Sequence, residues 1–241
     1  TMIESRAAFL AVGFILFSYV LLNTILFLKK LYYKKFILSS LYIIVPLFLA
    51  VIVNQLYFAE KGVDAVSRAA SISFSTNDGS VNQRLRYYED VYKHVISNPI
   101  FGVGLGNWKL KSIEYDSKDI VGYIVPYHAH SDFIQLGAEL GIIGFFLYLG
   151  IFIITVLFAL KIIWKSNISE KDKVFIFMLL TSLGVYTIDA NLNFPIARPQ
   201  VLVVWAFIIA VINNYVINYS KLNESRVKYK LLNPTFLFLS I

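Results

Sequence analysis

The stretch LGAELGIIGFFLYLGIFIITVLFAL, residues 136–160, contains a single charged side chain, that of Glu139. About 20 consecutive apolar residues are enough for a helix to cross the hydrocarbon core of a bilayer, so this stretch predicts a transmembrane helix. The composition agrees, because 58% of the 241 residues are hydrophobic, 15% are charged, and the mean hydropathy is +0.66. Soluble domains carry about 25% charged residues, and disordered chains have low hydrophobicity. Both classes are therefore excluded.

Four other apolar runs accompany this stretch. Together the five predict spans at about residues 7–28, 36–58, 136–160, 174–190 and 201–217. None alternates apolar and polar residues as a membrane barrel strand must, whereas a helix satisfies its own backbone hydrogen bonds in lipid. The sequence thus predicts an all-α polytopic membrane protein with about five transmembrane helices in one membrane domain, residues 1–220. We also expect the chain to be a fragment, the C-terminal part of a larger protein.

Basic residues predict the orientation of these helices. Residues 29–35, 161–173 and 221–230 each contain four Lys or Arg, and all three segments fall on one side if every run crosses the membrane. By the positive-inside rule this side is cytoplasmic. Residues 221–241 then form a cytoplasmic tail, and residues 59–130 form a long outer loop. The net charge of +7 follows from topology and gives no support to nucleic-acid binding.

The outer loop contains a predicted amphipathic helix at residues 81–97. Apolar and aromatic side chains recur at helical spacing from Val81 to Ile96, Ser80-Val-Asn-Gln83 fits a capping box, and Asn98-Pro99 ends the pattern. Arg84 and Tyr88 lie one turn apart on this helix, with Arg86 on another face. From the helix alone, Arg84 is more often a snorkelling or ion-paired surface side chain than a ligand contact.

Two loop motifs follow this helix. Glycines alternate at Gly102, Gly104 and Gly106, and their N–H groups could face a phosphate. The run matches neither the dinucleotide fingerprint nor the P-loop, so a turn-rich loop is the commoner interpretation. The second motif is His128-Ala-His130-Ser-Asp132, which precedes the third span.

Three interpretations of the histidine motif stay open. A metal site needs at least three ligands, and the chain offers no cysteine and no evident fourth ligand. His130 or Ser131 could simply cap the next helix. A neutral imidazole could also act as a general base toward a hydroxyl. Deeper in the span, Glu139 should have a protein partner, and the Gly137/Gly141 spacing is typical of close helix packing.

Other polar residues are expected at the same outer face. Arg6 opens the first span, and Asp189 and Arg198 lie in the connection between the fourth and fifth spans. Arginines beside a histidine suit a lipid-linked pyrophosphate, because the guanidinium fork matches phosphate oxygens. Stabilising the departing phosphate is also the largest contribution that a protein makes to such a transfer.

The order of these motifs resembles that of the O-antigen ligase and polysaccharide polymerase family. The motifs are Ser5-Arg6-Ala-Ala, the loop-helix Arg84, the segment from Asn98 to Asn107, and Ala129-His130-Ser-Asp leading to Glu139-Leu-Gly-Ile-Ile-Gly144. The last of these is the most specific. The resemblance covers roughly residues 1–220 and matches the C-terminal half of such proteins.

The resemblance implies a membrane enzyme whose active site faces the periplasm at the bacterial cytoplasmic membrane. It would move a glycan from an undecaprenyl-pyrophosphate donor to a hydroxyl of a glycan or lipid-core acceptor, without a nucleotide sugar, cofactor or metal. His130 would activate the hydroxyl, while Arg84 and Arg6 bind the pyrophosphate, so Arg84 becomes a functional candidate. Further candidates are Arg86 and Arg198 for the pyrophosphate, and His128, Ser131, Gly104 and Gly106 as supporting residues. Ser131 stands where the family often has Asn.

Alternatives to this function remain. A transporter or flippase for a lipid-linked sugar should carry ionisable groups near the bilayer midplane, but the spans hold almost no charge besides Glu139. A non-catalytic fragment and a protein O-oligosaccharyltransferase of the same family are further possibilities. Acceptor recognition is expected in residues 59–80 and 109–125, on position alone.

Overall fold

The computed structural model describes residues 6–30, 79–115, 127–165 and 168–231, with scattered positions between 41 and 56. In these ranges every regular element is a helix, which confirms the predicted all-α class. The elements are α1 (Arg6–Lys30), α4 (Gly79–Ser97), α5 (Trp108–Lys111), η2 (Ser112–Glu114), α6 (Asp132–Lys165), α7 (Glu170–Leu192), η3 (Pro195–Ala197) and α8 (Pro199–Leu231).

Four helices in the described part of the chain are long and apolar enough to cross a membrane: Ala7–Ile25, Asp132–Trp164, Glu170–Leu192 and Pro199–Tyr219. They correspond to four of the five predicted spans. The fifth prediction, at 36–58, falls outside the described residues except for scattered helical positions.

Three helices extend beyond the residues predicted for them. Helix α8 continues to Leu231, through much of the predicted tail, because no glycine or proline interrupts residues 200–233. Helix α6 begins at Asp132 and not at residue 136, since its polar first turn is still helical. Helix α4 begins at Gly79, which places Ser80 inside the helix and not at the predicted capping position. Residues 232–241 of the predicted tail lie outside the described residues.

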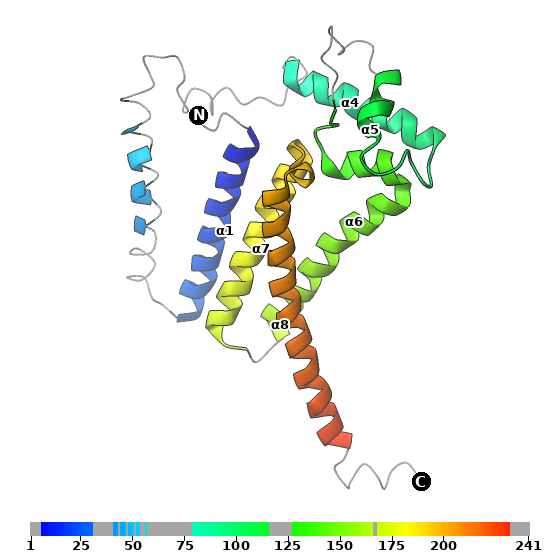
Figure 1. Ribbon diagram of the computed structural model, residues 1–241. Coiled ribbons are helices and arrows are strands. Elements are labelled where there is room, and N and C mark those ends of the chain that lie inside the picture. Colours follow the sequence, from blue (N-terminus) through cyan, green and yellow to red (C-terminus); the bar gives the residue numbers. More distant parts are fainter. Residues whose placement is uncertain are drawn as a thin grey trace, which may run out of the picture.

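Side chains of α6, α7 and α8 form the main core. An aromatic cluster of Phe152, Tyr186 and Trp205 has ring centroids 5.5–6.0 Å apart. Helix α1 lies along α7 (Figure 1), where Phe14 packs so closely on Gly184 that a Cβ there would overlap its ring. Van der Waals packing of this kind holds helices together in lipid, where the hydrophobic effect between them is weak.

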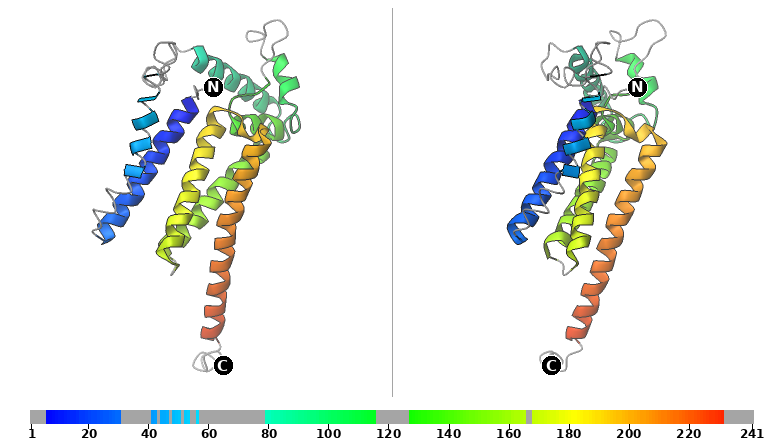
Figure 2. Two further views of the ribbon diagram at one scale, coloured as in Figure 1. Left: turned by 60° about the vertical axis from the view of Figure 1, so that its left-hand side comes forward. Right: turned by 90° about the vertical axis from the view of Figure 1, so that its left-hand side faces the viewer.

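The candidate site lies at one end of the bundle. Helix α4 and the beginnings of α1, α6 and α8 gather there, and the opposite ends of α1 and α6 lie at the other end with the C-terminal half of α8 (Figures 1 and 2). The basic segments at Lys29-Lys30 and after residue 220 are therefore both remote from α4. Both basic segments thus lie at the same end of the bundle, as the positive-inside rule requires of segments on one side of a membrane.

Helix α6 is broken at Gly141, which has φ 68° and ψ −170°. The break leaves backbone groups unpaired, and the loop after α4 satisfies them. Val103 N–H donates to the Ala138 carbonyl at 3.1 Å, Gly104 N–H to the Glu139 carbonyl at 2.7 Å, and Ile142 N–H to the Pro99 carbonyl at 2.9 Å. Non-helical backbone at membrane depth is tolerated only where protein or water satisfies it in this way.

The glycines of these two segments therefore serve a backbone contact. A Cβ at Gly141 would overlap the Ile100 carbonyl, and a Cβ at Gly102 would overlap the Ala138 carbonyl. The predicted helix packing at the Gly137/Gly141 pair was wrong, because a loop and not a helix contacts Gly141, and a Cβ at Gly137 would meet nothing within 4 Å.

Gly141→Ala is expected to lower the free energy of unfolding by about 2–4 kcal/mol. The φ and ψ of Gly141 lie in a region that is essentially restricted to glycine and costs an L-residue about 1–3 kcal/mol, and the overlap with Ile100 adds the cost of overpacking. Gly150→Ala is the matched control in the same helix, because a Cβ there meets nothing within 4 Å. Thermal unfolding of both variants in detergent measures the difference, and equal midpoints would contradict this account.

Candidate functional site

Helix α4 directs one face toward His130. The Tyr87 ring stacks on the His130 imidazole with centroids 6.0 Å apart and planes 12° apart. The Tyr88 hydroxyl donates to the His130 carbonyl at 3.3 Å and lies equally far from the Asn191 carbonyl. Arg84 precedes these tyrosines by three and four residues, so it shares their face of the helix. No described acid forms an ion pair with Arg84.

His130 occupies a strained and half-buried position. Its φ is 55°, a left-handed conformation that is uncommon outside glycine. Burial lowers the pKa of the imidazole, and the positive charges of Arg84 and His128 lower it further. The Nδ1 atom is buried and has no hydrogen-bond partner in the described structure. The imidazole is therefore neutral at neutral pH and can accept a proton, and strain of this kind concentrates at functional sites.

His128 is held by a chain of hydrogen bonds. The Gln135 amide donates from Nε2 to Glu139 Oε1 at 3.0 Å, so its Oε1 is the acceptor for Ala129 N–H at 3.2 Å. His128 Nδ1 lies 3.3 Å from the same Oε1 and therefore carries the proton. The other oxygen of Glu139 accepts from Gly106 N–H at 2.9 Å. Glu139 thus joins the loop at residues 102–107 to the segment that carries His128 and His130. The prediction that Glu139 has a protein partner is confirmed.

Glu139→Leu is expected to loosen the glycine loop, residues 102–107. Gly106 N–H and the Gln135 amide would lose their acceptor, and a buried unsatisfied group costs about 1–3 kcal/mol. Faster deuterium exchange over residues 102–107 is the measurement. Glu114→Gln is the control, because that carboxylate pairs with Lys111 at the surface, with 61% of its side chain exposed. Unchanged exchange in Glu139→Leu would refute the role of this carboxylate.

The connection between α7 and α8 completes the site. Asp132, which is 1% exposed, accepts from Ile196 N–H at 3.0 Å and so ties η3 to the start of α6. Phe194 stacks on His128 with centroids 4.1 Å apart and meets His130 edge-on at 5.4 Å. The Arg198 guanidinium lies over the Phe194 ring, with its Cζ 5.2 Å from the ring centre. Its Nη1 is 4.0 Å from Asp189 Oδ2, a contact at the limit of an ion pair.

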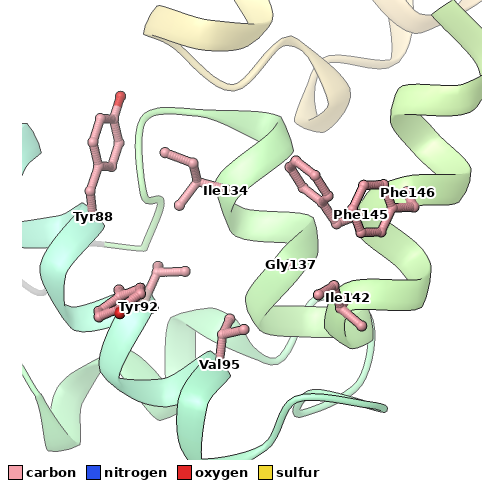
Figure 3. Close-up of a pocket in the computed structure, with 9 residues that line it drawn as sticks. Tyr88, Tyr92, Val95, Ile134, Gly137, Ile142, Phe145 and Phe146 are labelled. Atoms are coloured by element: carbon pink, nitrogen blue, oxygen red, sulfur yellow. The ribbon is translucent and has the colours of Figure 1, made fainter. Parts of the chain in front are cut away.

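An apolar pocket of about 310 Å³ lies beside the site. Figure 3 shows Tyr88, Tyr92 and Val95 of α4 on one side of this pocket. Residues of α6 lie on the other side, before and after the break at Gly141: Ile134, Gly137, Ile142, Phe145 and Phe146. Tyr88 therefore belongs both to this pocket and to the hydrogen bonds around His130.

Several predicted site residues come together, and others do not. Arg84, His128, His130 and Arg198 lie around Tyr87 and Phe194. Arg6 begins α1 at the same end of the bundle, but its side chain lies outside the described residues. Arg86 is two positions from Arg84, so it projects from another face of α4. Ser131 caps α6, because its Oγ accepts from Ile134 N–H at 3.4 Å.

The phosphate interpretation of the glycine run is wrong for Gly104 and Gly106. The N–H groups of Gly104 and Gly106 are both bonded to Glu139, so they do not face a phosphate. No three His, Cys, Asp or Glu side chains of the described ranges gather as metal ligands.

Sequence reasoning gave no role to the residues that join these elements: Tyr87, Gln135 and Phe194. The signals were present but weak. Tyr87 is adjacent to Tyr88, and Phe194 stands in a short loop between two spans. An aromatic side chain at such a position can pack against many different neighbours, so its position alone does not predict a contact with a histidine.

The described helices form a polytopic bundle with histidine and arginine side chains at one end, which is the architecture of a multi-pass membrane protein. The profile of the O-antigen ligase family matches residues 1–149, and the chain belongs to this family. Neither a curated protein nor a solved structure matches it. The family implies glycan transfer in the membrane with lipid-linked glycan substrates. The match contains Arg84 and His130 and ends before Phe194 and Arg198.

Proposed function

We propose that the protein transfers a glycan from an undecaprenyl-pyrophosphate donor to an acceptor hydroxyl at the periplasmic face of the bacterial cytoplasmic membrane. The observation that carries this proposal is the half-buried His130, whose pKa is lowered by burial and by the neighbouring charge of Arg84. A base and a cation side by side suit a reaction in which a hydroxyl loses a proton while a pyrophosphate departs.

In the proposed reaction the acceptor oxygen attacks the anomeric carbon of the donor sugar. The bond from that carbon to the pyrophosphate oxygen breaks, and undecaprenyl pyrophosphate leaves with the electron pair. His130 takes the hydroxyl proton, which later passes to water. The step needs neither a nucleotide sugar nor a metal.

The arginines supply the charge for the leaving group. Arg84 is the first candidate, because it has no described acidic partner and its charge lowers the pKa of His130. Arg198 directly precedes α8 and Arg6 begins α1, both at the same end of the bundle, and Arg86 is a further candidate from α4. Guanidinium groups keep their charge at every physiological pH and bind phosphate oxygens in pairs.

The orientation of the chain follows from its basic segments, which we assign to the cytoplasm. Residues 1–220 then form one membrane domain with its site outside. The acceptor is a lipid core, another lipid-linked repeat or a protein hydroxyl. The candidate acceptor segments at 59–80 and 109–125 lie largely outside the described residues.

Reconstitution tests the proposal. The purified full-length protein in vesicles receives an undecaprenyl-pyrophosphate glycan and an acceptor, and release of undecaprenyl pyrophosphate is measured together with the glycosylated acceptor. Equal amounts of both products are expected. Movement of the intact donor across the bilayer without either product would identify a flippase, the alternative function, and would overturn the proposal.

A further inference from the structure

His94 lies outside the candidate site, in a buried aromatic cluster between α4 and the two short helices that follow the glycine loop. It is 0% exposed, and its ring centroid lies 5.7 Å from that of Trp108 and 5.8 Å from that of Tyr115. Trp108 is also buried and stacks on Tyr115, with centroids 6.2 Å apart. The proposed transfer does not use His94.

These ring contacts determine where α5 and η2 lie. Helix α5 has four residues and η2 has three, which is too short for either helix to be stable on its own. Trp108 at the start of α5 packs with Val91 of α4 and Ala138 of α6 in one apolar cluster. The imidazole of His94 is therefore part of the surface that holds α5 and η2 on α4.

Only one nitrogen of this imidazole has a hydrogen-bond partner among the described residues. Nδ1 lies 3.2 Å from the Tyr115 hydroxyl, whereas Nε2 is buried and unpartnered. A neutral imidazole tolerates one unsatisfied nitrogen at a moderate cost. A protonated imidazole has a donor on both nitrogens, so it would bury a positive charge with one N–H group unpaired.

The surrounding helices offer no free counter-ion for a protonated His94. The acids of α4, η2 and α6 already have partners: Glu89 and Asp90 with Lys93 at 2.8 and 3.7 Å, Glu114 with Lys111 at 2.6 Å, Glu139 with Gly106 and Gln135, and Asp132 with Ile196. Burial lowers the pKa of His94 below its usual value of 6.5, the charge of Lys111 lowers it further, and Glu114 opposes this only in part.

We propose that His94 is an acid-sensitive latch, which holds α5 and η2 against α4 at neutral pH and releases them when the outer face is acidified. The inference goes beyond the proposed transfer, since it concerns the attachment of this segment and needs no substrate. The closed latch favours the neutral imidazole, and a released His94 reaches water and regains its usual pKa. The closed form therefore keeps its full stability above about pH 6.5 and loses it progressively as the pH falls below this value.

The latch also bears on the glycine loop. Trp108 directly follows Asn107, the last residue of that loop, and Glu139 holds the loop through Gly106. Release of α5 would thus remove one of the two attachments of the loop and leave the one to Glu139.

Hydrogen exchange tests the latch in the purified full-length protein in detergent. Protection factors of residues 107–115 are measured at about pH 7.5 and about pH 5.5, one unit on either side of the usual histidine pKa. These factors already correct for the dependence of intrinsic exchange on pH, so they report local opening. We expect protection to fall about tenfold at the lower pH, because the released form binds a proton there that the closed form does not. Equal protection at both pH values would overturn the inference.

Two variants assign the response to the imidazole. His94→Phe keeps a ring against Trp108 but cannot be protonated, and it leaves the other two histidines in place, so protection should be equal at the two pH values. Tyr115→Phe is the matched control, because it removes the hydroxyl beside Nδ1 and keeps the imidazole. It should lower protection severalfold at both pH values and preserve the tenfold ratio. A tenfold ratio that persists in His94→Phe would assign the response to another group and overturn the inference.

A further variant covers the case in which phenylalanine prevents folding. His94→Gln also cannot be protonated, keeps a polar side chain of similar reach, and should likewise abolish the ratio. The latch and the proposed function fail separately, because exchange is measured without donor or acceptor. Exchange that does not depend on pH would remove the latch and leave the transferase, and absence of transfer would leave the latch.

Discussion

His130→Ala is expected to lower the rate of glycan transfer by about 10²–10⁴-fold, the usual contribution of a positioned general base. Burial and the charge of Arg84 lower the pKa of the imidazole, so it is neutral and suits the proposed removal of a hydroxyl proton. Transfer is measured as glycosylated acceptor formed in vesicles. Helical content and membrane insertion should stay unchanged, because the imidazole is not part of the main core.

Backbone strain provides a control for this prediction. Glycine adopts the φ of 55° at residue 130 without steric cost, whereas alanine adopts it only with strain. His130→Gly should therefore be more stable than His130→Ala by about 1–2 kcal/mol, yet equally inactive. Thermal unfolding in detergent separates the two effects. Appreciable activity in the better-folded glycine variant would show that the imidazole is not the base.

Most of the membrane architecture could be predicted from the sequence, because hydropathy acts over a whole helix. The run at 136–160 crosses the membrane whatever its neighbours are. Its break at Gly141 could not be predicted, since glycine is also a common helix-packing residue in membranes. Whether Gly141 bends the chain depends on the Pro99 carbonyl and the other loop groups that replace the lost helical bonds.

The residue types of the candidate site could be predicted from the sequence, but their contacts could not. Arg84 and His130 are chemically distinctive, and the family resemblance places them. Their surroundings depend on contacts between remote segments, such as Phe194 against His128 or Gly106 against Glu139. No local pattern encodes these pairs. The alternating glycines illustrate the difficulty, because their N–H groups could have faced a phosphate but are bonded to α6.

The residues around the histidines have two different structural roles. The glycine loop, Gln135 and Glu139 fix the turn that carries both histidines, while α4 brings an arginine and two tyrosines to it. Such a framework can hold His130 in a strained conformation because packing and hydrogen bonds determine it from several sides. The side chain proposed as the base is thereby positioned before any substrate binds, which reduces the reorganisation needed during the proposed transfer.

Arg84→Gln is expected to lower transfer by about 10²–10³-fold, as for loss of one preorganised group that stabilises developing charge. It should also change the pH dependence. The positive charge of Arg84 lowers the pKa of His130, so its removal makes the imidazole easier to protonate and raises that pKa. Because only neutral His130 accepts a proton, the acid limb of kcat/KM should move to higher pH.

Two further variants of α4 make this prediction specific. Arg84→Lys keeps the positive charge but not the paired hydrogen bonds of guanidinium, so the acid limb should stay near its original pH while the rate remains reduced. Lys93→Ala removes another cation of α4. The Nζ atom of Lys93 lies 2.8 Å from Glu89 Oε1, in an ion pair at the surface. The substitution should change neither rate nor profile. An acid limb that is identical in Arg84→Gln and the unmodified protein would mean that Arg84 does not act on His130, whatever the loss in rate.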